Sequence, residues 1–319
     1  MGEAIITRAG GGEADTVIPI TPGYHTIRCT ISDFEGKRVP EGVYVNCKDG
    51  TRWYNYKTNA SGQVMFVCNS GSANLNISNN VNGIRFLDFN TCLYNIDAPI
   101  GLTTDLKINL NKGSTKYNIN TNSTIRFVQN RLTEVAMIGG GQGGYNGTGS
   151  FWSDRDPIQR GNGGNAGWYK ENKNMQFIGG TYYNCYIGQR GSIGGGSGGT
   201  TYIANTDMSA AGGGPGGTNA GAGANSSSAN GKGGNGVNGL GGGGGYFSIQ
   251  QEGPNVGTTG GSPYGGHGCY WHYSGSTVWY MPAGSGRGPG GGGGGGESND
   301  NNPSGGYGAN GIIIINIKY

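Results

Sequence analysis

Apolar and polar residues alternate in four short stretches of the first third of the chain, at residues 26–32, 43–47, 63–68 and 73–77. This period of two is typical of strands with one buried face. Glycine, asparagine, aspartate and serine separate the stretches and indicate turns. Short strands at this spacing predict an antiparallel β-sandwich over residues 23–115, which residues 84–89 and 105–110 complete or link to the next part. Residues 1–22 are polar and are expected to form an attachment arm.

Strand-like patterns return at intervals in the last two-thirds of the chain, between long glycine-rich stretches. They lie at residues 123–127, 132–138 and 181–187, and the chain closes with the apolar stretch 312–317. Of the 72 glycines, 13 precede residue 139, which leaves 59 from residue 139 onward. The closing apolar stretch would aggregate if it were exposed, so we expect it to return to a sheet.

The glycine-rich stretches form either an ordered scaffold or a solvated linker. Glycine loses more backbone entropy on folding than any other residue and adds no side chain to a core. Collagen is excluded, because glycine does not recur at every third residue over long stretches. Polyproline II helices have no internal hydrogen bonds, so glycine helices of this type can bond to one another laterally. Because strands and aromatic clusters interrupt the glycines, we predict an ordered all-β domain over residues 116–319, built from strands and packed polyglycine II helices.

The composition narrows the class of protein. Apolar residues make up 33% of the chain and charged residues 12%, and the net charge is +3. Nucleic-acid binding normally needs a basic patch or stripe, so we expect no nucleic-acid partner. No secretory signal and no membrane-spanning apolar run are apparent, so we expect synthesis in a cytoplasm and no membrane insertion. The six cysteines include no CxxC pair and are expected to be buried or unreactive thiols.

The turns of the first third follow a recognisable order. Residues 36–43 read G-K-R-V-P-E-G-V, and residues 58–64 read T-N-A-S-G-Q-V. This order resembles the prealbumin-like domains of surface proteins, in which a strand leads to G-x-x-V-P and T-[ND]-x-x-G opens a later strand. The resemblance implies an immunoglobulin-like or prealbumin-like sandwich that acts as a spacer or attachment module.

The last two-thirds of the chain follow a second order of parts. A strand ending in V-A-M-I at residues 135–138 precedes G-G-G, a further glycine block, G-G-G-S-G-G-T-T at 194–201, and G-G-Y-G-A-N-G-I-I-I-I at 305–315. This order resembles the glycine-rich domain of bacteriophage tail-fibre and minor structural proteins. It is similar to the tip adhesins of T-even-like phages, which carry a sandwich of polyglycine II helices. Inserts at 151–159 and 250–281 depart from that pattern. No receptor residue carries over, because loops in that family differ freely.

Aromatic residues beside polar ones gather in three clusters within the glycine-rich part. Tyrosine and tryptophan give a large, rigid contact area, which suits sugar and protein surfaces. The residues predicted to bind a receptor are Trp152, Arg155, Trp168, Tyr169, Tyr264, His267, Tyr270, Trp271, His272, Tyr273, Trp279 and Tyr280. The alternative is that these rings cap the glycine helices and build a small core.

Catalytic and metal-binding patterns are absent or incomplete. His267, Cys269 and His272 lack an evident fourth ligand for a structural zinc, so no metal is expected. Glycine follows Lys232, which excludes a Walker loop. No G-x-S-x-G nucleophile elbow stands between a strand and a helix. We therefore expect neither an enzyme nor a cofactor.

These features together predict a protein of the bacteriophage virion, specifically a tail-fibre or tail-tip adhesin. Its N-terminal region would contact other virion proteins, and its aromatic loops would bind a glycan or protein of the bacterial surface. A non-catalytic structural component of the capsid or tail is the first alternative. A bacterial cell-surface adhesin is the second, against which the missing secretory signal counts. A homo-oligomer also stays open.

Overall fold

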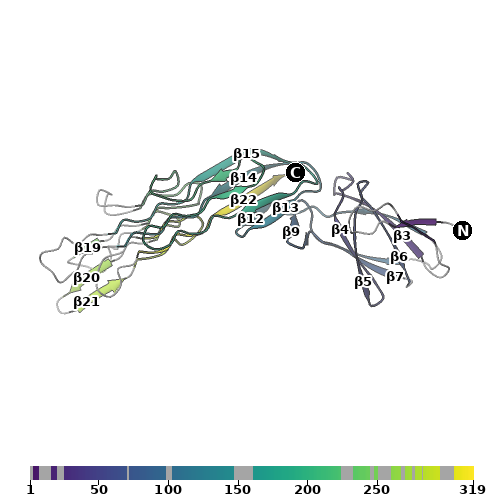
Figure 1. Ribbon diagram of the computed structural model, residues 1–319, viewed down its shortest axis with the longest axis horizontal. Helices are drawn as coiled ribbons and strands as arrows, with labels where there is room; N and C mark the ends of the chain where they lie inside the picture. The colour runs from purple at the N-terminus through teal and green to yellow at the C-terminus, as the bar shows by residue number, and fades with distance from the viewer. Residues whose placement is uncertain are drawn as a thin grey trace.

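The structure is a computed structural model, and it has an elongated, arched shape (Figure 1). It describes residues 3–6, 16–19, 25–69, 72–97, 103–146, 161–223, 233–244, 248–250, 260–266, 270–274, 277–281, 283–294 and 305–319. Only the backbone is described for residues 3–6, 16–19, 25, 97, 103, 104, 248–250, 270–274 and 277–281. Every element in these residues is a β-strand, which confirms the all-β prediction.

Two sheets form a β-sandwich at one end of the molecule. One sheet has the order β10–β7–β4–β5 and the other has the order β11–β3–β6. Their strands are β3 (His25–Ser32), β4 (Tyr44–Asp49), β5 (Arg52–Lys57), β6 (Gln63–Cys68), β7 (Ser72–Ile77), β10 (Cys92–Asp97) and β11 (Thr103–Asn109). The predicted alternation is confirmed. In β6, for example, every second residue is buried and the residues between them are half-buried.

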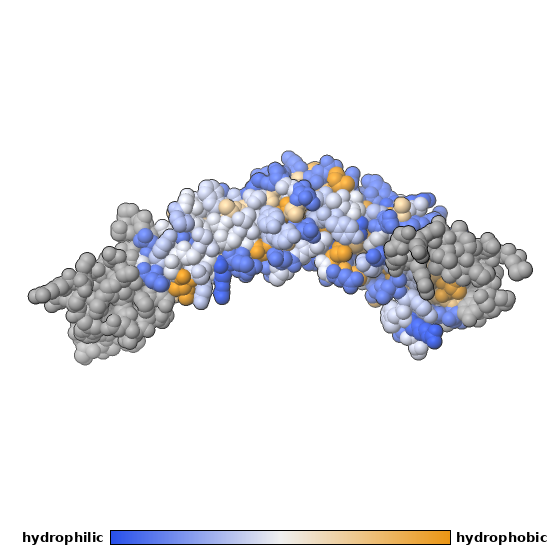
Figure 2. Space-filling view, in the orientation of Figure 1, coloured by the Kyte–Doolittle hydropathy of each residue, from blue (hydrophilic) through white to orange (hydrophobic). Residues whose placement is uncertain are grey.

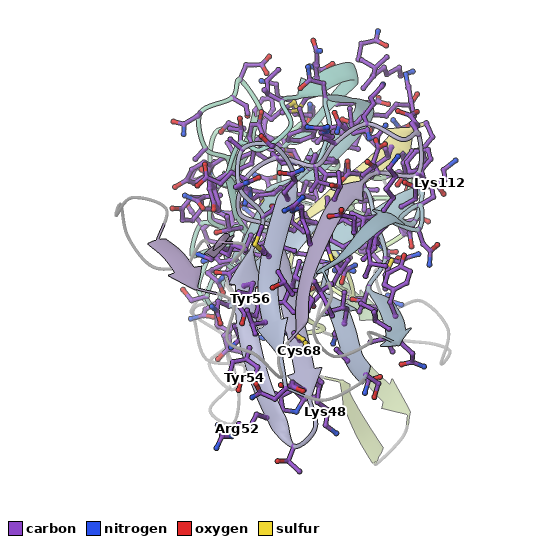
Figure 3. All side chains as sticks on the ribbon, turned by 90° about the vertical axis from the view of Figure 1, so that its right-hand side faces the viewer. Lys48, Arg52, Tyr54, Tyr56, Cys68 and Lys112 are labelled. Atoms are coloured by element: carbon purple, nitrogen blue, oxygen red, sulfur yellow. The ribbon has the colours of Figure 1, made fainter. Side chains whose placement is uncertain are left out.

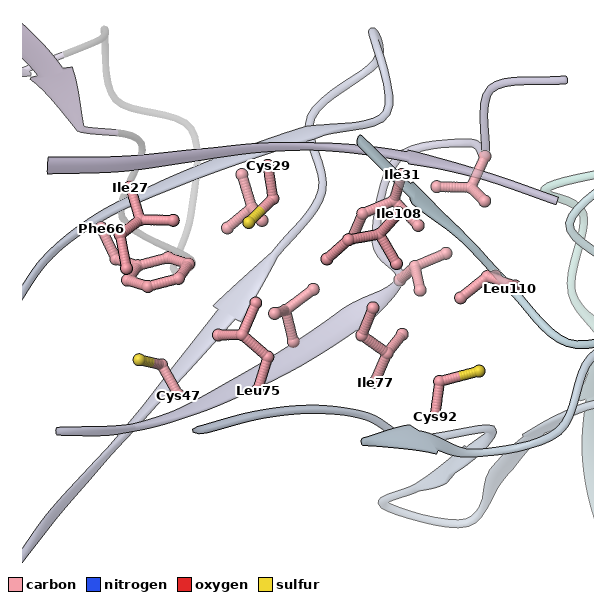
Figure 4. Packing of buried hydrophobic residues seen from close by; sticks show 14 of the residues in the cluster. Ile27, Cys29, Ile31, Cys47, Phe66, Leu75, Ile77, Cys92, Ile108 and Leu110 are labelled. Atoms are coloured by element: carbon pink, nitrogen blue, oxygen red, sulfur yellow. The ribbon is translucent and has the colours of Figure 1, made fainter. Parts of the chain in front are cut away.

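The core of the sandwich is made of aliphatic, aromatic and thiol side chains from both sheets. Ile27, Cys29 and Phe66 of one sheet face Cys47 and Leu75 of the other (Figure 4). All five cysteines within the described residues are buried and form no disulfide, as expected from the sequence. Burial raises the pKa of the Cys29 thiol to about 12, so this thiol is protonated and unreactive at neutral pH.

Two features of the sandwich differ from the prediction. β11 runs parallel to β3, so the sandwich is not wholly antiparallel. β5 and β10 were not expected as strands. In β5, which reads R-W-Y-N-Y-K, no residue is fully buried, so the strand lacks the pattern of a half-buried strand.

Two further sheets begin the glycine-rich part. The first has the order β12–β22–β14–β15 and the second has the order β18–β17–β16–β13–β9–β8. The strands are β8 (Asn80–Val81), β9 (Ile84–Phe86), β12 (Lys116–Ile119), β13 (Ser123–Arg126), β14 (Arg131–Ile138), β15 (Tyr169–Phe177), β16 (Tyr183–Tyr186), β17 (Thr201–Ile203), β18 (Ser209–Ala210) and β22 (Ile312–Lys318). The closing apolar stretch forms β22 between β12 and β14, which confirms that it returns to a sheet. A second core, with Phe127 stacked on Phe177, fills the space between these sheets.

The sandwich and the glycine-rich part are joined by a shared sheet and by buried ion pairs. β9 precedes residue 115 but pairs with β13, so the two parts share the six-stranded sheet. Arg131 at the start of β14 lies 3.1 Å from carboxylate oxygens of Asp33 and Asp88, and 3.3 Å from Glu35. Because Arg131, Asp33 and Asp88 are buried, these pairs fix how β14 leaves the sandwich.

The N-terminal region, expected as an arm, contains a hairpin. β1 (Glu3–Ile6) pairs antiparallel with β2 (Thr16–Pro19). β1 lies against β6, the edge strand of the three-stranded sheet. Part of the expected arm therefore lies against the edge of the sandwich.

Candidate functional site

Glycine-rich segments extend from the four-stranded sheet toward the end of the molecule opposite the sandwich (Figure 1). The described segments are 139–146, 161–168, 187–200, 211–223, 233–244, 260–266, 283–294 and 305–311, and together they are called the glycine lattice. Almost all of this backbone is neither helix nor strand. Backbone hydrogen bonds between different segments hold it together.

The segment that follows β14 shows how the lattice is bonded. The amides of Gly139, Gln142 and Tyr145 donate to the segment 162–168, at carbonyls that also recur every three residues. The amides between them donate in the same rhythm to two other segments, 196–199 and 306–309. Successive residues thus point to three different neighbours, and every third residue returns to the same one.

Three more stretches donate to the carbonyls of this central segment, and one of them is the first arm of 187–200, which a turn at 193–195 separates from the arm 196–199 counted above. Gly213 donates to Gly140, Gly191 to Gly141, and Gly293 to Gln142, over 2.8–2.9 Å. The central segment therefore has six bonded neighbours. Every backbone amide of residues 139–145 finds a partner, as an ordered chain without a large apolar core requires.

The close approach of the segments explains why so many of their residues are glycine. An added Cβ on Gly140 would lie 2.0 Å from the carbonyl oxygen of Gln189. On Gly143 it would lie 1.9 Å from that of Ser192, and on Gly144 1.8 Å from that of Gly294. No side chain fits at such distances, so the lattice depends on glycine for space rather than for flexibility.

Gln142 is a polar residue at the centre of the lattice, and the sequence analysis did not single it out. Its side chain is fully buried. Its amide nitrogen donates to Tyr145 Oη and to the Gly195 carbonyl, and its amide oxygen accepts from the Asn165 amide. This side chain therefore bridges three segments. In the sequence, the signal for such a role is a single amide residue within G-G-G-Q-G-G.

A small apolar cluster closes the base of the lattice, where it meets the sheet. Ile138 and Ile312, at the ends of β14 and β22, pack there with Ala166, Ala220 and Leu240. The hydrogen-bonded lattice is thus joined to the four-stranded sheet through a small hydrophobic core.

The ends of the segments that lie farthest from the sheet are bonded to one another. Tyr145 bonds to Asn162, Gly144 to Gly306, and Gly244 to Gly164. Gly294 bonds to both Gly284 and Gly306, and Gly261 bonds to Gly243. Three strands lie beyond that end: β19 (Ser248–Gln250), β20 (Tyr270–Ser274) and β21 (Thr277–Met281) (Figure 1). This distal end is the candidate functional site.

The twelve predicted receptor residues fall into three groups. Trp152, Arg155 and His267 lie outside the described residues. Six others lie on strands rather than on loops, and only their backbone is described: Tyr270, Trp271, His272, Tyr273, Trp279 and Tyr280. The remaining three, Trp168, Tyr169 and Tyr264, are described in full and lie nearer the base of the lattice.

The six strand residues belong to one three-stranded sheet. β20 pairs antiparallel with β21, which places Trp271 opposite Tyr280 and His272 opposite Trp279. β19 runs parallel to β20 and places Ile249 opposite Trp271. The backbone register thus places these residues in adjacent cross-strand rows.

Tyr169 and Tyr264 contribute to the scaffold. Both are half-buried and lie against the apolar cluster at the base. Asn238 donates to Tyr169 Oη over 2.9 Å, and burial raises the pKa of that phenol. A Cβ on Gly288 would lie 2.4 Å from the Tyr264 ring, so this ring covers Gly288 directly. These two residues fit the alternative in which aromatic rings build a small core.

Trp168 differs from its neighbour because its side chain is exposed. Its backbone lies within the lattice, with its amide bonded to Ala211 and its carbonyl to Gly139. Gly139 directly follows β14, so Trp168 lies at the base of the lattice and not at the distal end. The structure therefore does not bring Trp168 together with the six residues of β20 and β21.

Neither a metal site nor a membrane-spanning helix is found among the described residues. No cluster of three or more potential metal ligands occurs among them. Helices capable of crossing a membrane are also absent from the described part of the chain. The face seen in Figure 2 carries scattered hydrophobic residues among polar ones over its described part.

Comparisons with known proteins give distant structural likeness only. No family model matches the chain, and neither does any curated protein. Similar solved structures include the TIE protein of Bacillus anthracis, a streptococcal ancillary pilin, and a DUF3823 family protein from Parabacteroides merdae. Their identities to this chain are 10%, 9% and 10%, and their TM-scores are 0.25, 0.24 and 0.24. The matches cover 60%, 61% and 60% of this chain.

The matches cover 31%, 60% and 96% of those three proteins, so the chain spans less than two-thirds of the first two. Likeness at these TM-scores carries no function over to this chain.

Proposed function

We propose that this chain is a non-catalytic receptor-binding protein of the bacteriophage virion, a tail-fibre or tail-tip adhesin, which binds the bacterial surface with its distal end. The observation that carries the proposal is the convergence of lattice segments on one end of the molecule, beyond which lie β20 and β21. Aromatic residues are concentrated in those two strands. A glycan or a protein of the cell surface is the expected partner.

We further infer that the lattice segments are polyglycine II helices. Support comes from the three-residue rhythm of the hydrogen bonds made by residues 139–145. Polyproline II backbone also has three residues per turn and no internal hydrogen bonds. Such helices give the distal end a support whose bonds do not depend on the sequence of the connecting loops, so the loops can change without loss of the scaffold.

In this proposal the opposite end attaches the protein to the virion. The hairpin β1–β2 and the sandwich lie there, away from the distal sheet (Figure 1). The buried Arg131 pairs transmit orientation from the sandwich to β14 and so to the lattice. This arrangement suits a protein that holds a binding surface at a distance from its attachment point.

The test is to replace residues 267–282 by a short Gly-Ser loop and to measure adsorption of the particles to host cells. Adsorption should be lost, while incorporation of the protein into the particle and its melting temperature stay as in the wild type. A matched control removes the exposed, stacked rings of Tyr186 and Tyr202 on the six-stranded sheet by changing both to Ala. That control should adsorb normally.

Normal adsorption by the 267–282 replacement would contradict receptor binding at the distal end. It would favour the alternative of a structural component of the capsid or tail.

A further inference from the structure

The β4–β5 hairpin of the sandwich presents three side-by-side pairs of residues to solvent. Because Val45 and Cys47 of β4 point into the core, the residues between them face outward. The register places Lys48 opposite Trp53, Asn46 opposite Asn55, and Tyr44 opposite Lys57. These six residues are called the amide–aromatic face: Tyr44, Asn46, Lys48, Trp53, Asn55 and Lys57.

Both aromatic rings of this face lie next to an ammonium group. Lys48 Nζ lies 5.7 Å from the centre of the Trp53 ring, and Lys57 Nζ lies 4.8 Å from that of Tyr44. Trp53 is 57% exposed, which is unusual for a side chain of its size. A ring held beside a cation offers an apolar surface and a positive charge at the same place.

Asparagine amides extend the face across the sheet. Asn76 lies opposite Asn46, and Asn74 lies opposite Lys48. Asn95 on β10 in turn lies opposite Asn74. Each amide offers two donors and one acceptor. The Oδ1 atom of Asn76 is shielded from solvent and has no hydrogen-bond partner among the described residues, so turning this amide toward a ligand would satisfy an unpaired acceptor.

The charge of the face has one sign. Its charged side chains are Lys48 and Lys57, with no carboxylate in the three rows. Arg52 lies at the same end of the hairpin as Lys48 (Figure 3), but its direct pairing with Asp49 places it on the opposite side of the sheet, so it is not part of the face. Asp49, which pairs with Arg52 in register, is buried on the core side. An anionic ligand is therefore favoured over a neutral or cationic one.

The shape of the face suits an extended chain. It is an open sheet surface of four strands, so its width across the strands is roughly 14 Å from a strand spacing of about 4.8 Å. A sugar ring presents C–H groups on its faces and hydroxyl groups around its edge, which match aromatic rings and amides respectively. A nucleic acid would call for a more extensive basic stripe than two lysines.

We propose that the amide–aromatic face binds an acidic polysaccharide. The Trp53 and Tyr44 rings stack on sugar faces, the asparagine amides bond to hydroxyl groups, and Lys48 and Lys57 pair with the anionic groups. This site lies on the sandwich, away from the distal sheet. It gives the sandwich a binding role in addition to its role as a spacer, and it does not depend on the proposed receptor-binding function.

The test measures binding of the full chain to immobilised polygalacturonate, with neutral dextran and a single-stranded DNA oligonucleotide as comparison ligands. Wild type should bind polygalacturonate, and more weakly as salt rises, while dextran and DNA bind at least tenfold more weakly. Trp53→Ala should lower the affinity by about tenfold, as expected for truncation of a central aromatic contact. Trp53→Phe should restore most of the affinity.

The charge contribution is tested separately. Changing both Lys48 and Lys57 to Gln should lower the affinity and flatten its dependence on salt. The matched control is Lys107→Gln, an exposed lysine on β11 of the other sheet, which should bind as the wild type does. Denaturant midpoints of all variants confirm that they are folded.

Three results would overturn the proposal. One is a wild type that does not bind polygalacturonate. Another is binding that persists unchanged in Trp53→Ala and in the double lysine variant. The third is tighter binding of DNA than of polygalacturonate, which would assign the face to nucleic acid instead.

Discussion

Alanine at position 141 should disrupt the lattice at its centre. Gly141 donates to the Ala309 carbonyl over 2.8 Å and accepts from the Gly191 amide over 2.8 Å. An added Cβ would lie 2.0 Å from the carbonyl oxygen of Gly291, whereas real Cβ contacts essentially never fall below 3.0 Å. The segments around residues 141 and 291 must therefore separate by about 1 Å.

The cost of that separation follows from the bonds it breaks. Lengthening a bond of 2.8 Å by about 1 Å takes it beyond the range of a hydrogen bond. The bonds at risk are Gly141 to Ala309, Gly191 to Gly141, and Ala309 to Gly291. At about 0.5–1.5 kcal/mol net for each, with a further penalty for polar groups left unpaired, Gly141→Ala should lose about 2–5 kcal/mol of unfolding free energy. For a domain of this size that is a fall in melting temperature of roughly 5–15 °C.

A matched glycine provides the control. Gly216 has open space around its Cβ position and no positive φ, so Gly216→Ala should change stability by less than about 1 kcal/mol and in the stabilising direction. Both variants would be compared with the wild type by denaturant unfolding, followed by circular dichroism. If Gly141→Ala is as stable as Gly216→Ala, close backbone packing does not hold the lattice together.

Three further predictions concern groups outside the lattice. Arg131→Met leaves Asp33 and Asp88 buried without their cation, so unfolding in urea should show a loss of about 3–5 kcal/mol, and a loss below about 1 kcal/mol would be at odds with the buried network. Burial raises the pKa of Tyr56 from 10.0 to about 12, so the stability that this phenol contributes is complete below pH 10 and is lost as the pH rises toward 12. Tyr56→Phe should therefore unfold with a shallower loss of stability over that range, and an unchanged slope would refute this contribution. Cys29, Cys47, Cys68, Cys92 and Cys185 are buried, so they should react with a thiol reagent only after the protein is unfolded, and fast labelling of any of them in the native protein would disagree with the core described above.

The strands with one buried face could be predicted from the sequence. The alternation in β3, β4, β6 and β7 and the apolar residues of β14 and β22 mark which side faces a core. β15 could not be predicted in this way. It is an edge strand whose residues are mostly polar, with only Met175 and Phe177 buried, and its partner β14 determines its conformation.

The pairing within the lattice could not be predicted at all. Gly141 bonds to Ala309, which lies far along the chain, and no side chain at either position identifies the partner. The sequence could indicate that the glycine-rich part is ordered, but it could not indicate which of its residues bond to one another. Among the candidate site residues, Tyr169 and Tyr264 illustrate the same limit. Their rings fill space beside glycines, and only the packing of distant segments reveals that space.

Amide hydrogen exchange in the segment 139–145 tests the central claim most directly. Each amide in this segment donates to the backbone of another segment, and six neighbours exclude water from it. The account predicts that these amides exchange orders of magnitude more slowly than those of an unstructured peptide of the same sequence, as slowly as the amides of β14. Exchange at the rate of the free peptide would contradict a lattice held by lateral backbone hydrogen bonds.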